Sequence, residues 1–421
     1  MTTDRSDIVE QASYLQRLFT SLAIPAYRWL WLNSVFGSMR LIAVFVVRGW
    51  LVLTITDSPF WVGAAPAVRG LTQIALGGFA GVLLDRVNRR TALFLSETGA
   101  SLVAAGLAIL VIEGRIELWH ILVASVIEGV CVSVRWPAIN VILVDVVGPE
   151  RTLNATAAQM LGFNVGNIVA SSIAGLIISA YGIGFGYLFG ATCGLIGAVC
   201  TVFITGDFSP RVKETTAIAQ KSVLQAVGAA FSYIRHYQLL LSMIILAFLM
   251  SLLGWANLSM LPVIARDILF VDASGLGFLT TAGAVGSLIA TTIVAGLGDY
   301  EKKGRLIFAA GISTALFILL FSLSTNYMLS LFLIFLMQGA LMAFEVTITA
   351  SVLLMTAPHM QGRVQGLYTQ VFGFTWVGGV VLGTIAELSS APIAVAVGGA
   401  AIGGAVWLMR GQVATVDKTK N

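Results

Sequence analysis

The pattern of hydrophobic positions divides the chain into twelve long apolar runs. The runs lie at about 29–53, 61–84, 91–112, 119–146, 154–180, 184–205, 238–262, 275–297, 305–324, 328–356, 363–386 and 392–409. An α-helix needs roughly 20 apolar residues to cross a bilayer. The pattern therefore predicts an all-α membrane protein with 12 transmembrane helices. If the boundaries between adjoining runs were placed differently, the pattern would predict eleven or thirteen transmembrane helices.

Polar segments at residues 1–27, 206–237 and 411–421 flank and divide these runs. The middle segment separates two sets of six runs. We therefore expect one six-helix bundle over 28–205, a linker over 206–237, a second bundle over 238–410 and a short C-terminal tail. Within the first segment, four apolar residues recur at helical spacing: Leu15, Leu18, Phe19 and Leu22. This spacing suits a short helix lying on the membrane surface, with a frayed tail as the alternative.

Composition narrows the class of protein. Of 421 residues, 58% are hydrophobic and 10% are charged, whereas soluble domains carry about 25% charged residues. The mean hydropathy is +0.93. The sequence contains no P-loop, no HExxH motif, no paired metal ligands and no nucleophile elbow. These features predict a non-enzymatic protein of the lipid bilayer, without a metal, a cofactor or a nucleic-acid partner.

The distribution of basic residues predicts the orientation. If both termini are cytoplasmic, only Arg115 and Arg266 fall on outer loops, and most of the 24 Lys and Arg residues fall on the inner side. Positive charge concentrates on the cytoplasmic side of membrane proteins. The asymmetry favours an even number of spans with both ends inside.

The two halves of the chain correspond to each other. Residues in the first half match residues in the second at offsets of 214 and 210: Gly63 with Gly277, Asp85 with Asp299, Glu128-Gly129 with Gln338-Gly339, and Arg135 with Glu345. Many secondary transporters are internally duplicated, and their substrate lies at the interface of the repeats. The correspondence predicts two related bundles around a shared site.

A motif follows the second run, where the chain reads Gly81-Val-Leu-Leu-Asp85-Arg86-Val-Asn88-Arg89-Arg90. It resembles the signature loop of the major facilitator superfamily, G-x-x-x-D-R-x-G-R-R. Asn88 stands where the family prefers glycine, and asparagine also tolerates a left-handed turn. Segments 261–289 and 362–387 are similar to the enterobactin-exporter, or transmembrane secretion effector, branch. The fifth run departs from that branch, because Asn167 stands in place of the antiporter-motif proline.

The resemblance implies two pseudo-symmetric six-helix bundles and a monomer in the bacterial inner membrane. It also implies a proton-coupled exporter of a small amphiphilic molecule, anionic and siderophore-like. Three alternatives stay open: a multidrug/proton antiporter, an uptake system for an anionic nutrient, and a non-transporting scaffold. No ATP site is present, so a proton gradient is the expected energy source.

Ionisable residues inside the runs are the main site candidates, since each costs roughly 2.5–3.5 kcal/mol at the bilayer centre. Arg40, Arg48 and Arg69 suggest a basic cluster in the outer half that binds an anionic substrate. Pairing with Glu128 or with helix-end carbonyls is the alternative. In the superfamily fold the fourth and tenth helices face each other, so we expect Arg135 and Glu345 to meet across the cavity.

Substrate binding at Arg135 would then release Glu345 to take up a proton, with Glu128 as a second proton site. A static ion pair is the alternative. Other polar and aromatic residues of the spans extend the expected substrate surface: Trp136, Asn140, Asn164, Trp255, Gln338 and Trp376.

The resemblance assigns the cytoplasmic gate to the signature loop and to acidic residues near it. We expect Glu97 to pair with the basic loop residues. The complete expected gate comprises Gly81, Asp85, Arg86, Arg89, Arg90, Glu97, Asp145 and Asp299.

Overall fold

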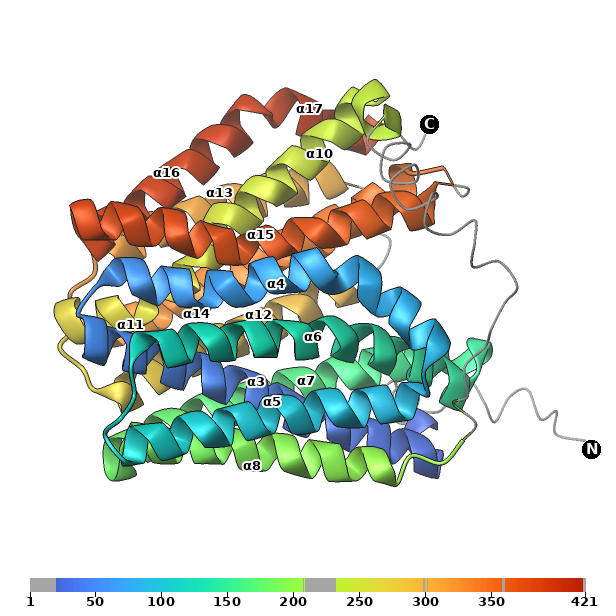
Figure 1. Cartoon of the computed structure of the whole chain (residues 1–421). Helices are drawn as coiled ribbons and strands as arrows, with labels where there is room; N and C mark the ends of the chain where they lie inside the picture. The colour runs from blue at the N-terminus through green and yellow to red at the C-terminus, as the bar shows by residue number, and fades with distance from the viewer. Residues whose placement is uncertain are drawn as a thin grey trace, which may run out of the picture.

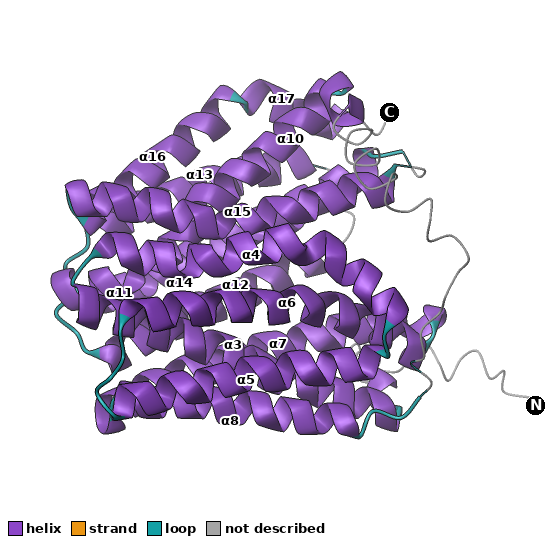
Figure 2. Cartoon of the chain, in the orientation of Figure 1, coloured by secondary structure: helices purple, strands orange, loops and turns teal. Residues whose placement is uncertain are grey.

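The computed structural model describes residues 20–206, 208, 232–297, 300, 302–357 and 360–418. Within these residues the chain is helical and contains no strand (Figure 2). The first half forms α3 (Pro25–Thr56), α4 (Pro59–Arg86), α5 (Arg89–Ile112), α6 (Leu118–Val147), α7 (Thr152–Tyr181) and α8 (Ile183–Val202). Short 3-10 turns, η1 (Thr20–Ala23) and η2 (Pro149–Arg151), precede α3 and α7.

The second half begins with an irregular helix. It consists of α10 (Gln238–Leu249), η3 (Met250–Gly254), η4 (Trp255–Met260), α11 (Leu261–Val263) and η5 (Ile264–Ile268). Regular helices follow: α12 (Ala273–Gly296), α13 (Lys303–Ser322), α14 (Tyr327–Met355), α15 (Gln361–Leu388) and α16 (Ala391–Leu408). The chain then forms α17 (Arg410–Thr415) and η6 (Val416–Lys418).

Each of the twelve predicted apolar runs therefore has a helical counterpart among the described residues. Ten of these segments are long and apolar enough to cross a membrane. The other two are α4 and α15, which lie beside each other where the two halves meet (Figure 1). Several side chains of both helices lie outside the described residues.

The ends of the helices follow from local sequence. Pro25 and Pro59 occupy the first positions of α3 and α4, where a missing N–H costs nothing. Gly148 and Gly182 end α6 and α7 with φ angles of 76° and 97°, which glycine adopts without strain. Asn88 is not left-handed as expected. It has φ −64° and caps α5, accepting hydrogen bonds from the backbone of Arg90 and Thr91.

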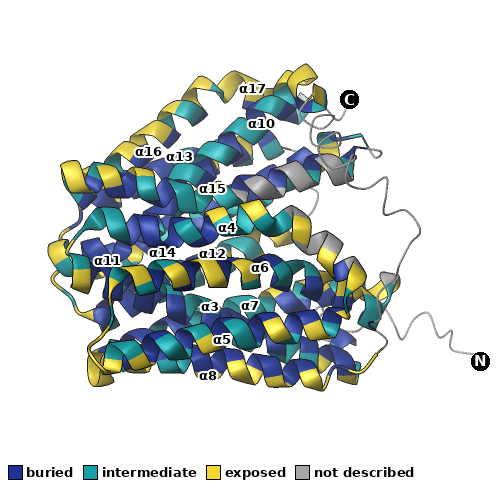
Figure 3. Ribbon diagram, in the orientation of Figure 1, coloured by how far each residue is buried: buried dark blue, intermediate teal, exposed yellow. Residues whose placement is uncertain are grey.

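The lipid-facing surface is recognisable by exposed apolar side chains. On α5, Leu95, Leu102 and Ile109 are seven residues apart and are 54–61% exposed. This spacing places them on one face of the helix. Exposed positions follow the outer helices of both bundles (Figure 3). A continuous apolar surface of this kind suits hydrocarbon rather than water.

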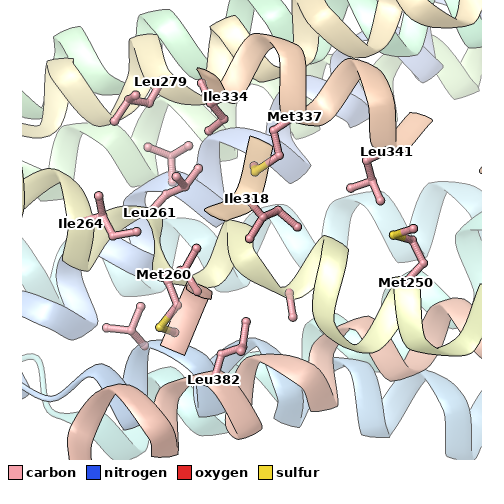
Figure 4. Close-up of a cluster of buried hydrophobic side chains, with 14 of the residues drawn as sticks. Met250, Met260, Leu261, Ile264, Leu279, Ile318, Ile334, Met337, Leu341 and Leu382 are labelled. Carbon is pink, nitrogen blue, oxygen red and sulfur yellow. The ribbon is translucent and has the colours of Figure 1, made fainter. Parts of the chain in front are cut away.

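The core of the second bundle forms around the irregular helix. Met250, Met260 and Leu261 lie among side chains of α12, α13, α14 and α15 (Figure 4). Pro262, the 3-10 turn and the two π-helical stretches interrupt regular hydrogen bonding here. Such irregular backbone is tolerated at membrane depth only where it is buried in protein or lines a water-filled cavity. The segment predicted at 238–262 extends to Ile268.

The bundles meet along two helix pairs, α4 with α15 and α7 with α12. Glycines allow both approaches. A Cβ on Gly63 would lie 1.9 Å from the carbonyl oxygen of Gly379, and one on Gly175 would lie 2.9 Å from the Cα of Gly277. Gly63 and Gly277 are the residues that the internal repeat relates. The two crossings thus use equivalent positions.

The chain ends depart from the expected tails. Residues 411–418 pack onto the second bundle, where Val413 is fully buried and Gln412 accepts a 2.9 Å hydrogen bond from Ser242. Asp417 accepts a 2.7 Å bond from the Gly304 amide at the start of α13. Most of the predicted surface helix at 15–22 and most of the linker at 206–237 lie outside the described residues.

Candidate functional site

The inner cluster consists of Arg40 on α3, Glu97 on α5 and Arg135 on α6. All three are buried, with Glu97 at 0% exposure. The two oxygens of Glu97 accept from different arginines, Oε2 from Arg40 Nε at 3.4 Å and Oε1 from Arg135 Nε. Gly37 gives the guanidinium of Arg135 its space, since a Cβ there would overlap it. One carboxylate thus serves two buried arginines.

The outer cluster consists of Arg48 on α3, Arg69 on α4 and Glu128 on α6. Arg48 Nη1 donates to Glu128 Oε2 at 2.9 Å and to Ser125 Oγ at 3.2 Å. Arg69 is 4% exposed and lies over the ring of Trp376, 4.4 Å from its centroid. This cluster also holds two arginines and one carboxylate.

Trp376 brings the second bundle to the outer cluster, because it belongs to α15. Its ring packs edge-on against Phe45 of α3, with the centroids 6.1 Å apart. Gly70 permits the approach, since a Cβ there would lie 2.4 Å from the indole. The stacked Arg69 and Trp376 therefore join the two bundles at this level.

The acidic cluster lies in the second bundle around Glu345 of α14. Glu345 is 6% exposed, and its Oε1 accepts a 2.7 Å hydrogen bond from the hydroxyl of Tyr368. The Tyr368 and Thr349 hydroxyls are 3.0 Å apart. Trp255 lies near the carboxyl, but Glu345 Oε2 and Trp255 Nε1 have no hydrogen-bond partner among the described residues. Among the described residues, the Tyr368 hydroxyl holds the carboxyl, and no cation pairs with it.

Three sequence expectations are corrected by this geometry. Arg135 and Glu345 do not pair, since each finds its partner in its own bundle. Glu97 does not pair with the signature loop, because it lies deeper and holds Arg40 and Arg135. The expected single cluster of three arginines is divided, because the two-turn separation of Arg40 and Arg48 places them at different depths. The alternative pairing of Arg48 with Glu128 is confirmed.

Other expected substrate residues are distributed around these clusters. Trp136 lies 5.3 Å from the guanidinium carbon of Arg135 and 5.4 Å from the ring of Phe163. Gln338 is buried on α14, and its Nε2 has no partner among the described residues. Asn164 is half-buried, whereas Asn140 is exposed. The structure does not draw these residues into one constellation.

The signature loop forms a separate polar cluster at the C-terminal end of α4. Arg89 Nη1 donates to Asp145 Oδ2 at 2.9 Å, and both side chains are less than 10% exposed. Arg90 bonds the carbonyl oxygen of Val202, and Arg86 is exposed. Arg89 and Asp145, both assigned to the expected gate, thus form an ion pair. The surroundings of Gly81, the side chain of Asp85 and the whole of Asp299 lie outside the described part of the structure.

Polar contacts that the sequence did not suggest join the bundles at the end that carries the α3–α4 and α15–α16 connections (Figure 1). Arg266 donates to Asp57 Oδ1 at 2.5 Å and to the Leu53 carbonyl oxygen at 3.2 Å. Glu387 on α15 accepts from the Ser58 hydroxyl at 2.8 Å and from the Phe60 amide at 3.2 Å. Asp57 and Glu387 stand just after the ends of apolar runs, and this position is the one sequence feature that could have indicated these contacts.

A similar contact joins α7 to α12. Asp272 caps α12 and accepts a 2.5 Å hydrogen bond from Ser179. The hydroxyls of Ser179 and Ser274 hold the pKa of Asp272 below its ordinary value. Deeper in the same pair, Thr281 lies within 3 Å of the hydroxyls of Ser171 and Ser172. At this end of the molecule, hydrogen bonds thus join both helix pairs, α4 with α15 and α7 with α12.

Comparison with known families is decisive for classification. The family described as transmembrane secretion effector, of the major facilitator superfamily, matches residues 17–420. The chain belongs to this family. It is 23% identical over 362 residues to the enterobactin exporter EntS of Escherichia coli O81 (strain ED1a), covering 86% of this chain and 85% of that protein. EntS of Shigella boydii serotype 18 matches to the same extent.

Solved structures agree on the fold. A mutant of the nucleoside transporter NupG superposes with a TM-score of 0.73 at 14% identity, covering 93% of this chain and 99% of that one. A bacterial homologue of the human lysosomal transporter Spinster, in an inward-facing and unoccupied conformation, gives 0.67 at 14% identity, with 94% and 96% coverage. The chain is a multi-pass membrane protein with a transporter fold.

Proposed function

We propose that this secondary transporter is a proton-coupled exporter of a small amphiphilic anion, siderophore-like in character. The observation that carries the proposal is the surplus of buried positive charge in the first bundle. In its inner and outer clusters four arginines face two glutamates, apart from the buried Arg89–Asp145 pair of the signature loop. Buried charge is retained in a membrane protein when it serves a substrate or ion pathway. The similarity to enterobactin exporters supports the direction and the class of cargo.

The proposed topology has twelve spans with both termini in the cytoplasm of the bacterial inner membrane. The connections α3–α4, α5–α6 and α15–α16 lie on one face (Figure 1). The signature loop between α4 and α5, with its arginines, lies on the other. The positive-inside rule then makes the latter face cytoplasmic.

The proposed mechanism is alternating access, and in the proposed orientation we assign this structure to the state closed on the outside. Glycine contacts and hydrogen bonds join α4 to α15 and α7 to α12 in their outer halves. To release cargo outward, these contacts must separate while the cytoplasmic ends approach each other. Rocking of one bundle against the other around a fixed site accomplishes this exchange.

Glu345 is the proposed proton carrier. Its carboxyl faces Tyr368 and Trp255 and has no ion-pair partner among the described residues. A buried carboxyl without a cation can change protonation without breaking an ion pair. Glu128 is a weaker candidate, since Arg48 already holds its charge. The surplus arginines bind cargo in one bundle while Glu345 exchanges a proton in the other.

The test is transport by the purified protein in sealed vesicles. Enterobactin loaded on the cytoplasmic side should leave faster when a proton gradient is imposed, and Glu345→Gln should remove the effect of the gradient. Glu113→Gln is the matched control, because that carboxylate is exposed on an outer turn. Enterobactin flux that is the same with and without the proton gradient would refute proton coupling. Absence of any flux would favour a non-transporting scaffold.

Uptake is the second candidate, supported by the nucleoside transporter fold. The same vesicles distinguish it, since a nucleoside supplied outside would accumulate inside with the gradient. Efflux of an organic cation such as ethidium, without enterobactin flux, would instead favour a multidrug antiporter. The surplus of buried arginine argues against a cation, because like charges repel most strongly where water is excluded.

A further inference from the structure

The outer cluster is not electrically balanced. Arg48 and Arg69 carry two positive charges, and Glu128 is the carboxylate that faces them. All three side chains are at least nine-tenths buried. Removing one member of a buried charge set leaves the remaining charge unpaired and costly. The cluster therefore carries one uncompensated positive charge, which a single bound anion would neutralise.

Its hydrogen bonds are incomplete in the same place. Arg69 Nε has no hydrogen-bond partner among the described residues, and the guanidinium rests on the face of Trp376. Arg48 uses one nitrogen, while its Nε and Nη2 have no partner. Buried donors are nearly always satisfied in native proteins, so a group of unsatisfied ones needs a specific explanation. Guanidinium donors fit carboxylate and phenolate oxygens well.

The inner cluster provides an internal comparison. There Glu97 accepts from both arginines, so each arginine has a carboxylate oxygen. In the outer cluster Glu128 bonds Arg48 alone, and its Oε1 has no partner. Among the described residues, Arg69 is therefore the buried arginine without a carboxylate partner.

Two aromatic rings lie beside the arginines of the outer cluster. Trp376 of the second bundle lies beneath Arg69, and Phe45 meets Trp376 edge-on. An aromatic ligand can pack against these rings while its oxygen binds the guanidinium groups. We infer that Arg69 and Arg48, with Trp376 and Phe45, form a subsite for one oxyanion carried on an aromatic ring. The inference rests on the proposed export function and specifies the cargo group that this site takes.

The test uses purified full-length protein with benzoate as the probe and benzamide as its neutral counterpart. Benzoate should raise the thermal-unfolding midpoint in a concentration-dependent manner, because it binds the folded state. Benzamide should have little effect. Arg69→Gln should weaken benzoate binding by about tenfold or more, since it removes a charge-assisted contact. Arg115→Gln is the matched control, since Arg115 is exposed on an outer turn.

A second readout separates binding from a structural role. Arg69→Gln should unfold at the same or a higher temperature than the wild type without ligand, because an unpaired buried charge is removed. Loss of stability in this variant would identify Arg69 as a structural residue and overturn the inference. Equal responses to benzoate and benzamide, or unchanged benzoate binding by Arg69→Gln, would also overturn it.

Enterobactin flux distinguishes failure of the subsite from failure of the proposed function. If the wild type exports enterobactin but shows no preference for benzoate, the subsite is wrong and the exporter stands. If benzoate binds through Arg69 but no enterobactin moves, the subsite stands and the cargo must be another aromatic anion or the protein does not transport.

Discussion

The two bundles share a framework but differ in their buried charge. The first holds four arginines and two glutamates in two clusters. The second, among its described residues, holds Glu345, which accepts a hydrogen bond from the Tyr368 hydroxyl. Arg135 and Glu345 occupy repeat-related positions on α6 and α14, and yet they make unrelated contacts. Duplication thus preserved the helices and the crossings, while the chemistry at equivalent positions diverged.

This difference suggests a division of labour. An arginine stays charged at every relevant pH, so the first bundle presents a permanent attraction for an anion. A carboxyl held by hydroxyls can be charged or neutral, so the second bundle can respond to protons. The predictions below test whether the bundles differ in these ways.

The largest expected effect is on Glu97. Glu97→Gln leaves Arg40 and Arg135 without a counter-charge and should destabilise the protein by about 3–5 kcal/mol. Unfolding of the purified protein by heat or denaturant measures the loss. Glu345→Gln, which breaks no ion pair, should cost about 1 kcal/mol or less. Equal losses for the two variants would mean that the bundles do not differ in their dependence on charge.

The next effect concerns the contacts between the bundles. Gly63→Ala places a Cβ 1.9 Å from the Gly379 oxygen, so the outer ends of α4 and α15 must move apart at a cost of about 1–3 kcal/mol. Hydrogen exchange of the outer turns should accelerate and transport should slow. Gly77→Ala is the control, because nothing lies within 4 Å of its added Cβ. Identical behaviour of the two variants would contradict the outer closure.

Tyr368→Phe tests the hydroxyl that holds Glu345. It removes a 2.7 Å hydrogen bond, which is worth about 0.5–1.5 kcal/mol. The pH profile of enterobactin transport should shift while flux persists, since the carboxyl keeps its place but loses its donor. An unchanged profile would separate Glu345 from proton coupling.

The smallest effect is at Asp272. Because its pKa is lowered in the folded protein, its contacts contribute stability above its ordinary pKa. That contribution disappears as the pH falls through the lowered value. Asp272→Asn keeps a capping group and should cost only a few tenths of a kcal/mol near neutral pH. Acid titration of unfolding should show one fewer acid-sensitive step in the variant, and an unchanged titration would exclude this contact.

Much of the fold could be predicted from the sequence. Apolar runs fix helices because a backbone in lipid must satisfy its own hydrogen bonds, and all twelve runs became helices. The signature loop and the repeat indicated the superfamily and the related halves. Local rules failed where the backbone was irregular, as between Met250 and Ile268, and where the C-terminal tail packed onto the bundle.

The sequence by itself indicated which residues carry buried charge, since seven charged residues stand well inside the apolar runs, away from their ends. Only the tertiary structure decided their partners. Arg135 bonds Glu97 rather than Glu345, Arg69 lies on Trp376, and Asp57 and Glu387 fasten the outer ends. Partner choice depends on how each helix is rotated and how far apart the bundles stand. The hydrophobic pattern predicts that a residue lies in a span. It does not predict which residues of different spans meet, because distances between spans depend on how the whole molecule packs.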